Sequence, residues 1–130
     1  MILTLALLAT SLLFGGMVLY SFGFAAILFK TLPPKVAGQT LRRAFPYFYT
    51  FVIGSALVAS VLTWPGDTLS AGLLAFIGLT TLPARQILMP AINRATDTGA
   101  KTRFNWLHSV SIALTLAHIG VAGLVLVRFV

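Results

Sequence analysis

Three ionisable side chains lie within or at the ends of long apolar stretches: Arg85, His108 and His118. A charge inside a bilayer is costly, so residues of this kind are candidate functional groups. A histidine in such a place can ligate haem or copper, or it can stay neutral and hydrogen-bond across helices. An arginine near a helix end can extend towards lipid phosphate or pair with an acceptor. These three residues are therefore the first candidates for chemistry.

Arg85 and His108 are predicted to face each other near one end of the molecule. At about 1.5 Å per helical residue, Arg85 lies near the end of the third apolar stretch and His108 about one turn inside the fourth. Asp97 is the only carboxylate expected on this side, so it is the candidate partner of Arg85. The predicted polar cluster consists of Tyr47, Arg85, Gln86, Asn105, His108 and Ser111. In the alternative interpretation, Arg85 reaches lipid phosphate and His108 caps or cross-links helices.

His118 is expected near the middle of the fourth stretch, at a depth close to that of Met17 and Ser55. Ten residues of helix separate it from His108 by about 15 Å, so the two histidines cannot share one metal. Haem or copper would need either a pair of His118 with Met17 or one His118 from each of two protomers. We instead expect no cofactor and no metal. A neutral His118 would donate a hydrogen bond to Ser55, to Ser60 or to a backbone carbonyl.

The chain offers few groups for catalysis. Asp67 and Asp97 are its only acids, and they fall in connections predicted on opposite sides of the membrane, which excludes paired-carboxylate chemistry. The chain has neither cysteine nor glutamate. Thiolate chemistry and proton-driven export through an intramembrane carboxylate are therefore not expected. We predict no catalytic residues and a non-enzymatic protein.

Four apolar stretches must position these side chains. The composition is 58% hydrophobic and 8% charged, whereas soluble domains carry about a quarter charged residues. Because a spanning helix needs about 20 apolar residues, four spans are predicted, at about 2–29, 46–64, 68–88 and 104–127. A short basic interfacial segment is predicted at 35–44, with Pro46 in the first turn of the second span and a kink at Pro83. All 130 residues then form one domain, 1–130.

Basic residues orient these spans. Eight of the nine Lys and Arg residues fall in or beside the first and third connections, and Arg128 is the exception. Because basic connections stay in the cytoplasm, both termini are predicted on the outer side. The predicted fold is therefore an all-α integral membrane protein, an antiparallel four-transmembrane-helix bundle. The net charge is +7, and we expect the basic residues to contact anionic lipid headgroups. Nucleic acid is excluded as a partner, because the basic residues adjoin apolar spans and form no long run.

Short motifs in a fixed order give the chain a family resemblance. They are Ala37-Gly38 with Phe45-Pro46-Tyr47, then Pro90 with Ile92-Asn93 and Asp97, then Arg103-Phe104 with Leu107-His108 and Ser111. This pattern resembles a bacterial family of unknown function related to eukaryotic transmembrane protein 205. The resemblance implies a four-helix integral membrane protein, with residues 103–111 as its most characteristic part. We expect the protein in the bacterial inner (plasma) membrane. The resemblance also implies a distant link to copper-resistance protein D-like and haem-dependent protoporphyrinogen oxidase membrane families.

Three functions remain open from the sequence. The first is a non-enzymatic accessory or interaction subunit that packs with other membrane proteins or with further copies of itself. The second is a haem- or metal-binding membrane protein built on His118 or His108. The third is an oligomeric exporter of a small solute or metal, which would be favoured if polar residues of spans two to four lined a common cavity.

Overall fold

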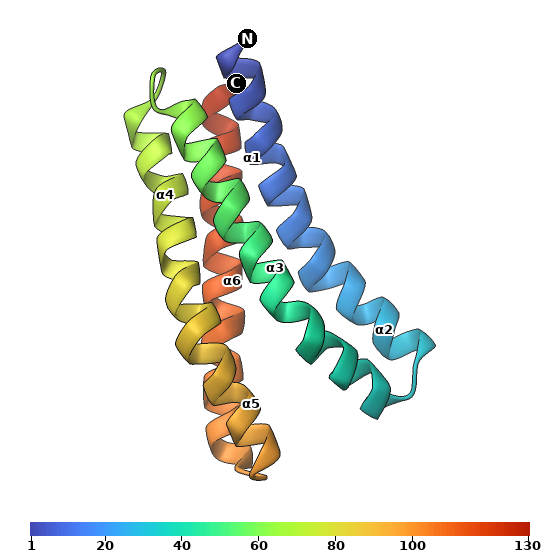
Figure 1. Cartoon of the computed structure of the whole chain (residues 1–130). Helices are drawn as coiled ribbons and strands as arrows, with labels where there is room; N and C mark the ends of the chain where they lie inside the picture. Colours follow the sequence, from blue (N-terminus) through green and yellow to red (C-terminus); the bar gives the residue numbers. More distant parts are fainter.

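The computed structural model describes all 130 residues, and nearly the whole chain is helical. In chain order the elements are α1 (Ile2–Val18), η1 (Leu19–Phe24), α2 (Ala25–Thr31), α3 (Pro34–Thr63), α4 (Thr68–Pro83), η2 (Ala84–Leu88), α5 (Met89–Asp97) and α6 (Lys101–Phe129). The elements η1 and η2 are wider, π-helical turns that join the α-helices on either side into continuous rods (Figure 1).

Four rods are long and apolar enough to cross a membrane, judged by length and composition: Ile2–Thr31, Pro34–Thr63, Thr68–Asp97 and Lys101–Phe129. The prediction of an all-helical protein with four membrane-spanning helices is therefore confirmed. A helix of this size is about 45 Å long, whereas the hydrocarbon core is about 30 Å thick. The rods are longer than the predicted spans because their polar ends stay helical beyond the apolar stretches.

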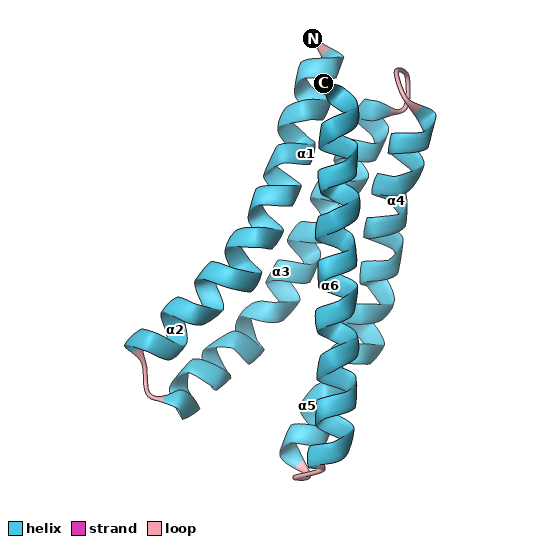
Figure 2. Cartoon of the chain, turned by 180° about the vertical axis from the view of Figure 1, so that it is seen from behind, coloured by secondary structure: helices cyan, strands magenta, loops and turns pink.

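The rods pack into a bundle in which α1 and α4 each contact both α3 and α6. Both chain termini lie at one end of the bundle, and the chain reverses direction between successive rods (Figures 1 and 2). Towards the other end, the pair α2–α3 diverges from the pair α5–α6 (Figure 2). The packing is therefore closest near the termini and in the middle of the bundle.

The second rod differs from the prediction in where its helix begins. Pro34 stands in the first turn of α3, and Pro46 lies in the helix interior instead of at its start. The predicted basic segment 35–44 is thus the first part of one continuous helix. A proline lacks the N–H that would bond to the carbonyl four residues earlier, here that of Arg42. Losing that single bond has not ended the helix.

The third rod absorbs two prolines through its π-helical turn. Pro83 ends α4, η2 follows, and Pro90 lies near the start of α5. Within this turn the backbone N–H of Met89 bonds to the carbonyl of Ala84, five residues earlier. This wider pattern allows the rod to continue past Pro83, as predicted. The rod ends before Gly99, whose positive φ of 70° favours glycine.

Aliphatic side chains from all four rods fill the bundle core. The largest fully buried ones are Leu13, Met17, Val52, Leu74, Ile77 and Val125. Small residues let neighbouring helices approach at two levels: an added Cβ at Gly78 would lie 3.2 Å from Leu57, and one at Gly16 would lie 2.5 Å from the ring of Phe51. Close van der Waals packing of this kind is what holds helices together in lipid.

We expect Gly16→Ala to lower stability and the neighbouring Gly15→Ala to leave it unchanged or slightly higher. The added methyl of Gly16→Ala meets the Phe51 ring, and overpacking of this kind costs about 1 to 3 kcal/mol. Nothing lies within 4 Å of a Cβ added at Gly15, where the change only improves helix propensity. Thermal unfolding of both variants in the same detergent gives the comparison. Equal melting temperatures for the two variants would contradict this account of the α1–α3 contact.

Candidate functional site

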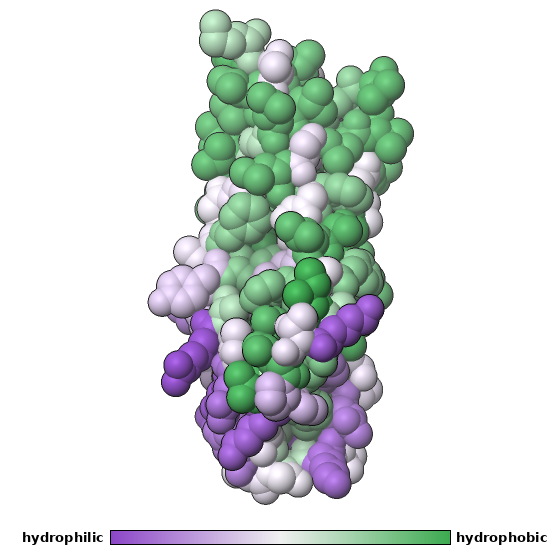
Figure 3. Space-filling view, turned by 90° about the vertical axis from the view of Figure 1, so that its right-hand side faces the viewer, coloured by the Kyte–Doolittle hydropathy of each residue, from purple (hydrophilic) through white to green (hydrophobic).

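One end of the molecule is strongly basic. The eight Lys and Arg residues predicted to cluster lie at the end of α2, in the first part of α3, in η2 and α5, and at the start of α6. Hydrophobic side chains cover most of the length of the molecule, and hydrophilic side chains gather at the end opposite the termini (Figure 3). We call this the basic end. Asp97 is its only acidic residue.

A cavity of about 610 Å³ lies at the basic end, between α2–α3 and α5–α6. Polar lining side chains come from three of the four rods and include Lys35, Arg42, Tyr49, Asp97, His108 and Ser111. The apolar part of the lining includes Phe29, Leu41, Phe45, Met89, Ile92 and Phe104. The cavity thus combines ion-pairing and hydrogen-bonding groups with an apolar wall, the composition typical of a ligand site.

An ion pair between Arg42 and Asp97 joins α3 to α5 beside this cavity. Two parallel hydrogen bonds form it, from Nη1 to Oδ1 at 2.7 Å and from Nη2 to Oδ2 at 2.8 Å. The side chains are 44% and 55% exposed, so water and salt screen the pair and it adds little to the stability of the fold. Asp97 is therefore the partner of Arg42 and not of Arg85, which corrects the sequence prediction. Fifty-five residues separate the two in the chain, a distance that no local pattern spans.

Deeper in the cavity, the Tyr49 hydroxyl lies 3.4 Å from the Ser111 hydroxyl, which links α3 to α6. Tyr49 belongs to an aromatic group with Phe45 and Phe48, and the ring of Tyr20 from η1 stacks on Phe48 with centroids 4.0 Å apart. The buried Tyr20 hydroxyl has no hydrogen-bond partner. The predicted polar cluster includes Tyr47 and not Tyr49, so sequence reasoning missed the place of Tyr49 in the cavity.

The six residues of the predicted polar cluster do not come together as one group. His108 and Ser111 line the cavity, and the His108 ring stacks on Phe104 with centroids 5.3 Å apart. Asn105 is exposed, and Tyr47, which is 80% exposed, lines a separate apolar groove between α1–α2 and α3. Two helical positions separate Tyr47 from Tyr49, and this turns their side chains to different faces of α3.

Arg85 and Gln86, the other two members of the predicted cluster, interact with each other and with α3. Arg85 Nη1 donates to Gln86 Oε1 at 3.2 Å, and Nε donates to the backbone carbonyl of Pro46 at 3.3 Å. Arg85 makes no hydrogen bond to His108. The arginine therefore connects η2 to the helical turn of α3 that contains Pro46.

His118 is buried, with 5% of its surface exposed, and bonds to a neighbouring helix. Its Nε2 lies 2.7 Å from the hydroxyl oxygen of Thr80 on α4. In the tautomer protonated at Nε2, His118 donates to the Thr80 hydroxyl oxygen, and that hydroxyl donates in turn to the carbonyl of Phe76. The predicted partners lie elsewhere, because Ser55 donates within its own helix and Ser60 donates to the carbonyl of Ala71. His118 thus cross-links α6 to the third rod and not to the second.

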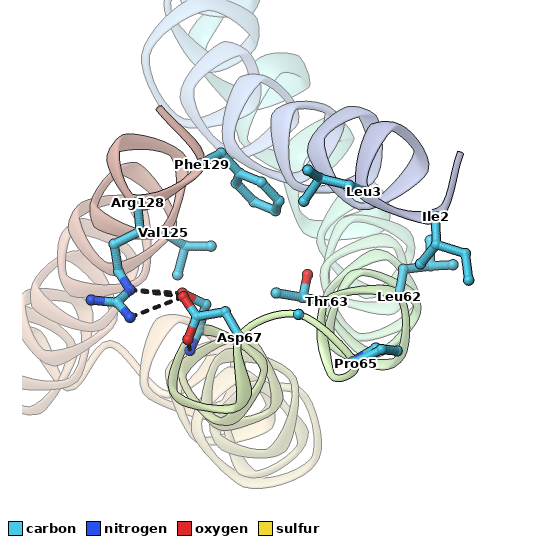
Figure 4. A pocket seen from close by; sticks show the side chains of 11 residues that line it. Ile2, Leu3, Leu62, Thr63, Pro65, Asp67, Val125, Arg128 and Phe129 are labelled. Atoms are coloured by element: carbon cyan, nitrogen blue, oxygen red, sulfur yellow. Dashed lines mark hydrogen bonds and ion pairs between the residues drawn. The ribbon is translucent and has the colours of Figure 1, made fainter.

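The end opposite the basic end has its own ion pair, at the edge of a cavity of about 710 Å³ (Figure 4). Asp67 caps α4 by accepting from the Ser70 N–H at 3.1 Å and from its hydroxyl at 2.6 Å. Arg128 Nε donates to Asp67 at 3.0 Å and to the Ser70 hydroxyl at 2.9 Å. The Ser70 hydrogen bonds, with a smaller contribution from Arg128, lower the pKa of Asp67 to about 2. The carboxylate therefore stays ionised at neutral pH and neutralises the one basic side chain at this end.

Residues 8–101 match the family model described as a domain of unknown function (DUF4149). The chain belongs to this family. The match covers most of the first rod and all of the second and third, and it ends at the first residue of α6, so residues 103–111 lie outside it. No curated protein and no solved structure matches the chain. Its place is therefore among small membrane proteins of unknown function.

We expect Thr80→Val to lower stability by about 0.5 to 2 kcal/mol, because the buried His118 N–H loses its acceptor in an apolar environment. Thr80→Ser retains the hydroxyl and serves as the matched control. Thermal unfolding in detergent measures both variants. The visible spectrum of gently extracted protein should show no absorption band that depends on His118. A Soret band or bound copper that disappears in His118→Ala would contradict this structural role.

Proposed function

We propose that this DUF4149 protein is a non-enzymatic accessory or interaction subunit of the bacterial inner membrane, which packs against other membrane proteins or further copies of itself. The main observation in support of this proposal is the outward surface of α6. This helix buries only His118, Ala122 and Val125 within the bundle. Many of its other side chains are exposed and free to contact lipid or another protein.

Small residues follow one another along the exposed part of α6: Ser109, Ala113, Ala117 and Gly120 are all exposed. Their spacing of four, four and three residues places them near one another on the helix surface. Nothing lies within 4 Å of a Cβ added at Gly120. Rows of small residues let a second transmembrane helix approach closely, which is the main source of attraction between helices in lipid. This row therefore favours a protein partner on α6.

The contacts of the candidate chemical groups support a structural role for each of them. Asp97 pairs with Arg42 and Asp67 with Arg128, at opposite ends of the bundle. The His118 ring forms a hydrogen bond with the Thr80 hydroxyl. In this proposal the protein has no catalytic residue and no resident haem or metal, and its ionisable groups hold helices together.

The exporter hypothesis receives less support. Polar residues of the second, third and fourth rods do share the cavity at the basic end, as that hypothesis requires. However, the bundle core is filled by the buried side chains of Leu13, Met17, Leu74 and Ile77. We therefore treat the cavity as a site at one end of the bundle and not as part of a pathway across it.

The distribution of charge supports an orientation with the basic end in the cytoplasm and both termini outside. Eight basic residues lie at one end. The single arginine at the other end, Arg128, is neutralised by Asp67. The positive-inside rule and the anionic lipids of the inner leaflet both favour this orientation of an antiparallel bundle.

If α6 binds a partner, mild extraction should yield a complex larger than one protomer, and Ala117→Leu should release the protomer from it. The leucine enlarges one residue in the row of small residues. Ala26→Leu, which makes the same change at an exposed position of α2, should leave the complex intact. Size-exclusion chromatography with identification of co-migrating subunits measures the outcome. A wild-type protein that elutes as a single protomer, with no companion, would count against the accessory role.

Single cysteines test the orientation, because the natural chain has none. Gly66→Cys, in the turn between α3 and α4, should react with a membrane-impermeant maleimide added to intact spheroplasts. Thr98→Cys, at the basic end, should react only after the membrane is permeabilised. Both positions are exposed, so a difference in labelling reports the side of the membrane. The reverse pattern would place the basic end outside and refute the orientation.

A further inference from the structure

We propose that the cavity at the basic end binds one anionic amphiphile, a molecule with a phosphate or carboxylate group and an apolar chain. The anionic group would pair with Arg42 and Lys35, and the apolar part would lie against the aromatic and aliphatic lining. Without the ligand, Asp97 pairs with Arg42. When the ligand binds, its anionic group replaces Asp97 as the partner of Arg42. This binding site goes beyond the accessory role and does not depend on it.

The geometry of Arg42 supports an anion as the ligand. Its guanidinium already binds a carboxylate through two parallel hydrogen bonds, the arrangement that also suits phosphate. The pair is exposed, so an anion from outside can compete with Asp97 for the same two N–H groups. Lys35 lines the same cavity and takes part in no ion pair. An incoming anion thus meets two cations for one internal carboxylate.

The apolar lining supports a ligand with a hydrocarbon part. Phe45, Met89 and Phe104 line the same cavity, and the methionine side chain adapts readily to different apolar shapes. A volume of about 610 Å³ falls within the range of small-molecule sites. A free inorganic anion would leave this lining without a partner.

The position of the cavity matches the depth at which an amphiphile lies in a bilayer. The cavity lies where the pair α2–α3 diverges from the pair α5–α6, at the end of the molecule where the hydrophilic surface begins (Figures 2 and 3). A charged group at this level lies among lipid headgroups, and an attached chain extends towards the hydrocarbon. Deeper in the cavity, the hydroxyls of Tyr49 and Ser111 offer hydrogen bonds to ester or hydroxyl oxygens of such a ligand.

Two sources supply this chemistry: an anionic membrane lipid and a free single-chain amphiphile. Both are tested with the full-length protein in nanodiscs of zwitterionic phosphatidylcholine. Isothermal titration with dodecyl phosphate should give saturable binding of one molecule per protomer. Nanodiscs that also contain phosphatidylglycerol should abolish this binding if the source is a membrane lipid and leave it unchanged if the source is a free amphiphile. No saturable binding in phosphatidylcholine, or equally tight binding of inorganic phosphate, would overturn the proposal.

Two neighbouring arginines separate a defined site from general attraction to a basic surface. Arg42→Gln should weaken dodecyl phosphate binding at least tenfold, because a charged hydrogen-bonded pair with the ligand is lost. Arg43→Gln removes the same charge from the next residue, which does not line the cavity, and should change the affinity less than twofold. Equal weakening by both substitutions would show that the ligand senses only the surface charge.

Asp97→Asn should tighten binding several-fold, because Arg42 no longer has an internal carboxylate to exchange. A misfolded variant cannot produce this gain. The double variant Arg42→Gln/Asp97→Asn has the same net charge as the natural chain, yet it should still bind several-fold more weakly than the natural chain, because the two N–H groups that bind the anion are absent. Recovery of natural affinity in the double variant would refute the role of Arg42, as would an unchanged affinity in Asp97→Asn.

Discussion

The need to satisfy backbone hydrogen bonds without water is the constraint on which this structure depends. Inside a bilayer an unpaired N–H or carbonyl has no solvent to bond to, so a spanning segment must be helical. Of 111 backbone hydrogen bonds, 98 lie within helices, which leaves few for turns and caps. The interior prolines are tolerated under the same constraint. Pro83 and Pro90 flank a π-helical turn, and α3 continues through Pro46 with the loss of a single backbone hydrogen bond.

The same constraint governs the polar side chains. Many hydroxyls bond to a carbonyl one turn earlier on their own helix, as Thr10 does to Ala6. A few hydroxyls instead form hydrogen bonds to a neighbouring helix, namely Thr80 with His118 and Ser60 with the carbonyl of Ala71. These bonds hold the helices in their relative positions. The two Arg–Asp pairs stay at the ends of the bundle, where water and headgroups reduce the cost of a charge.

The two ends of the bundle consequently have different properties. At the end that carries the termini, Arg128 and Asp67 neutralise each other beside a capped helix. At the other end, eight cations face a single carboxylate, and the diverging helices leave a cavity between them. An accessory protein with this design would offer α6 to a neighbour in the membrane and a cationic site to an anion at the basic end.

The sequence by itself determined that the chain has four spanning helices, because runs of apolar residues must bury their backbone polar groups in helices wherever they cross lipid. It also showed that eight of the nine Lys and Arg residues lie in or beside the first and third connections, with Arg128 as the exception. Only the tertiary structure decided which polar groups meet. Arg42 and Asp97 are far apart in sequence, and His118 faces Thr80 instead of Ser55 because that choice depends on how each helix is rotated about its axis. The rotation cannot be predicted from the sequence, because apolar side chains cover nearly every face of each helix. It is determined by the packing of small residues against large ones.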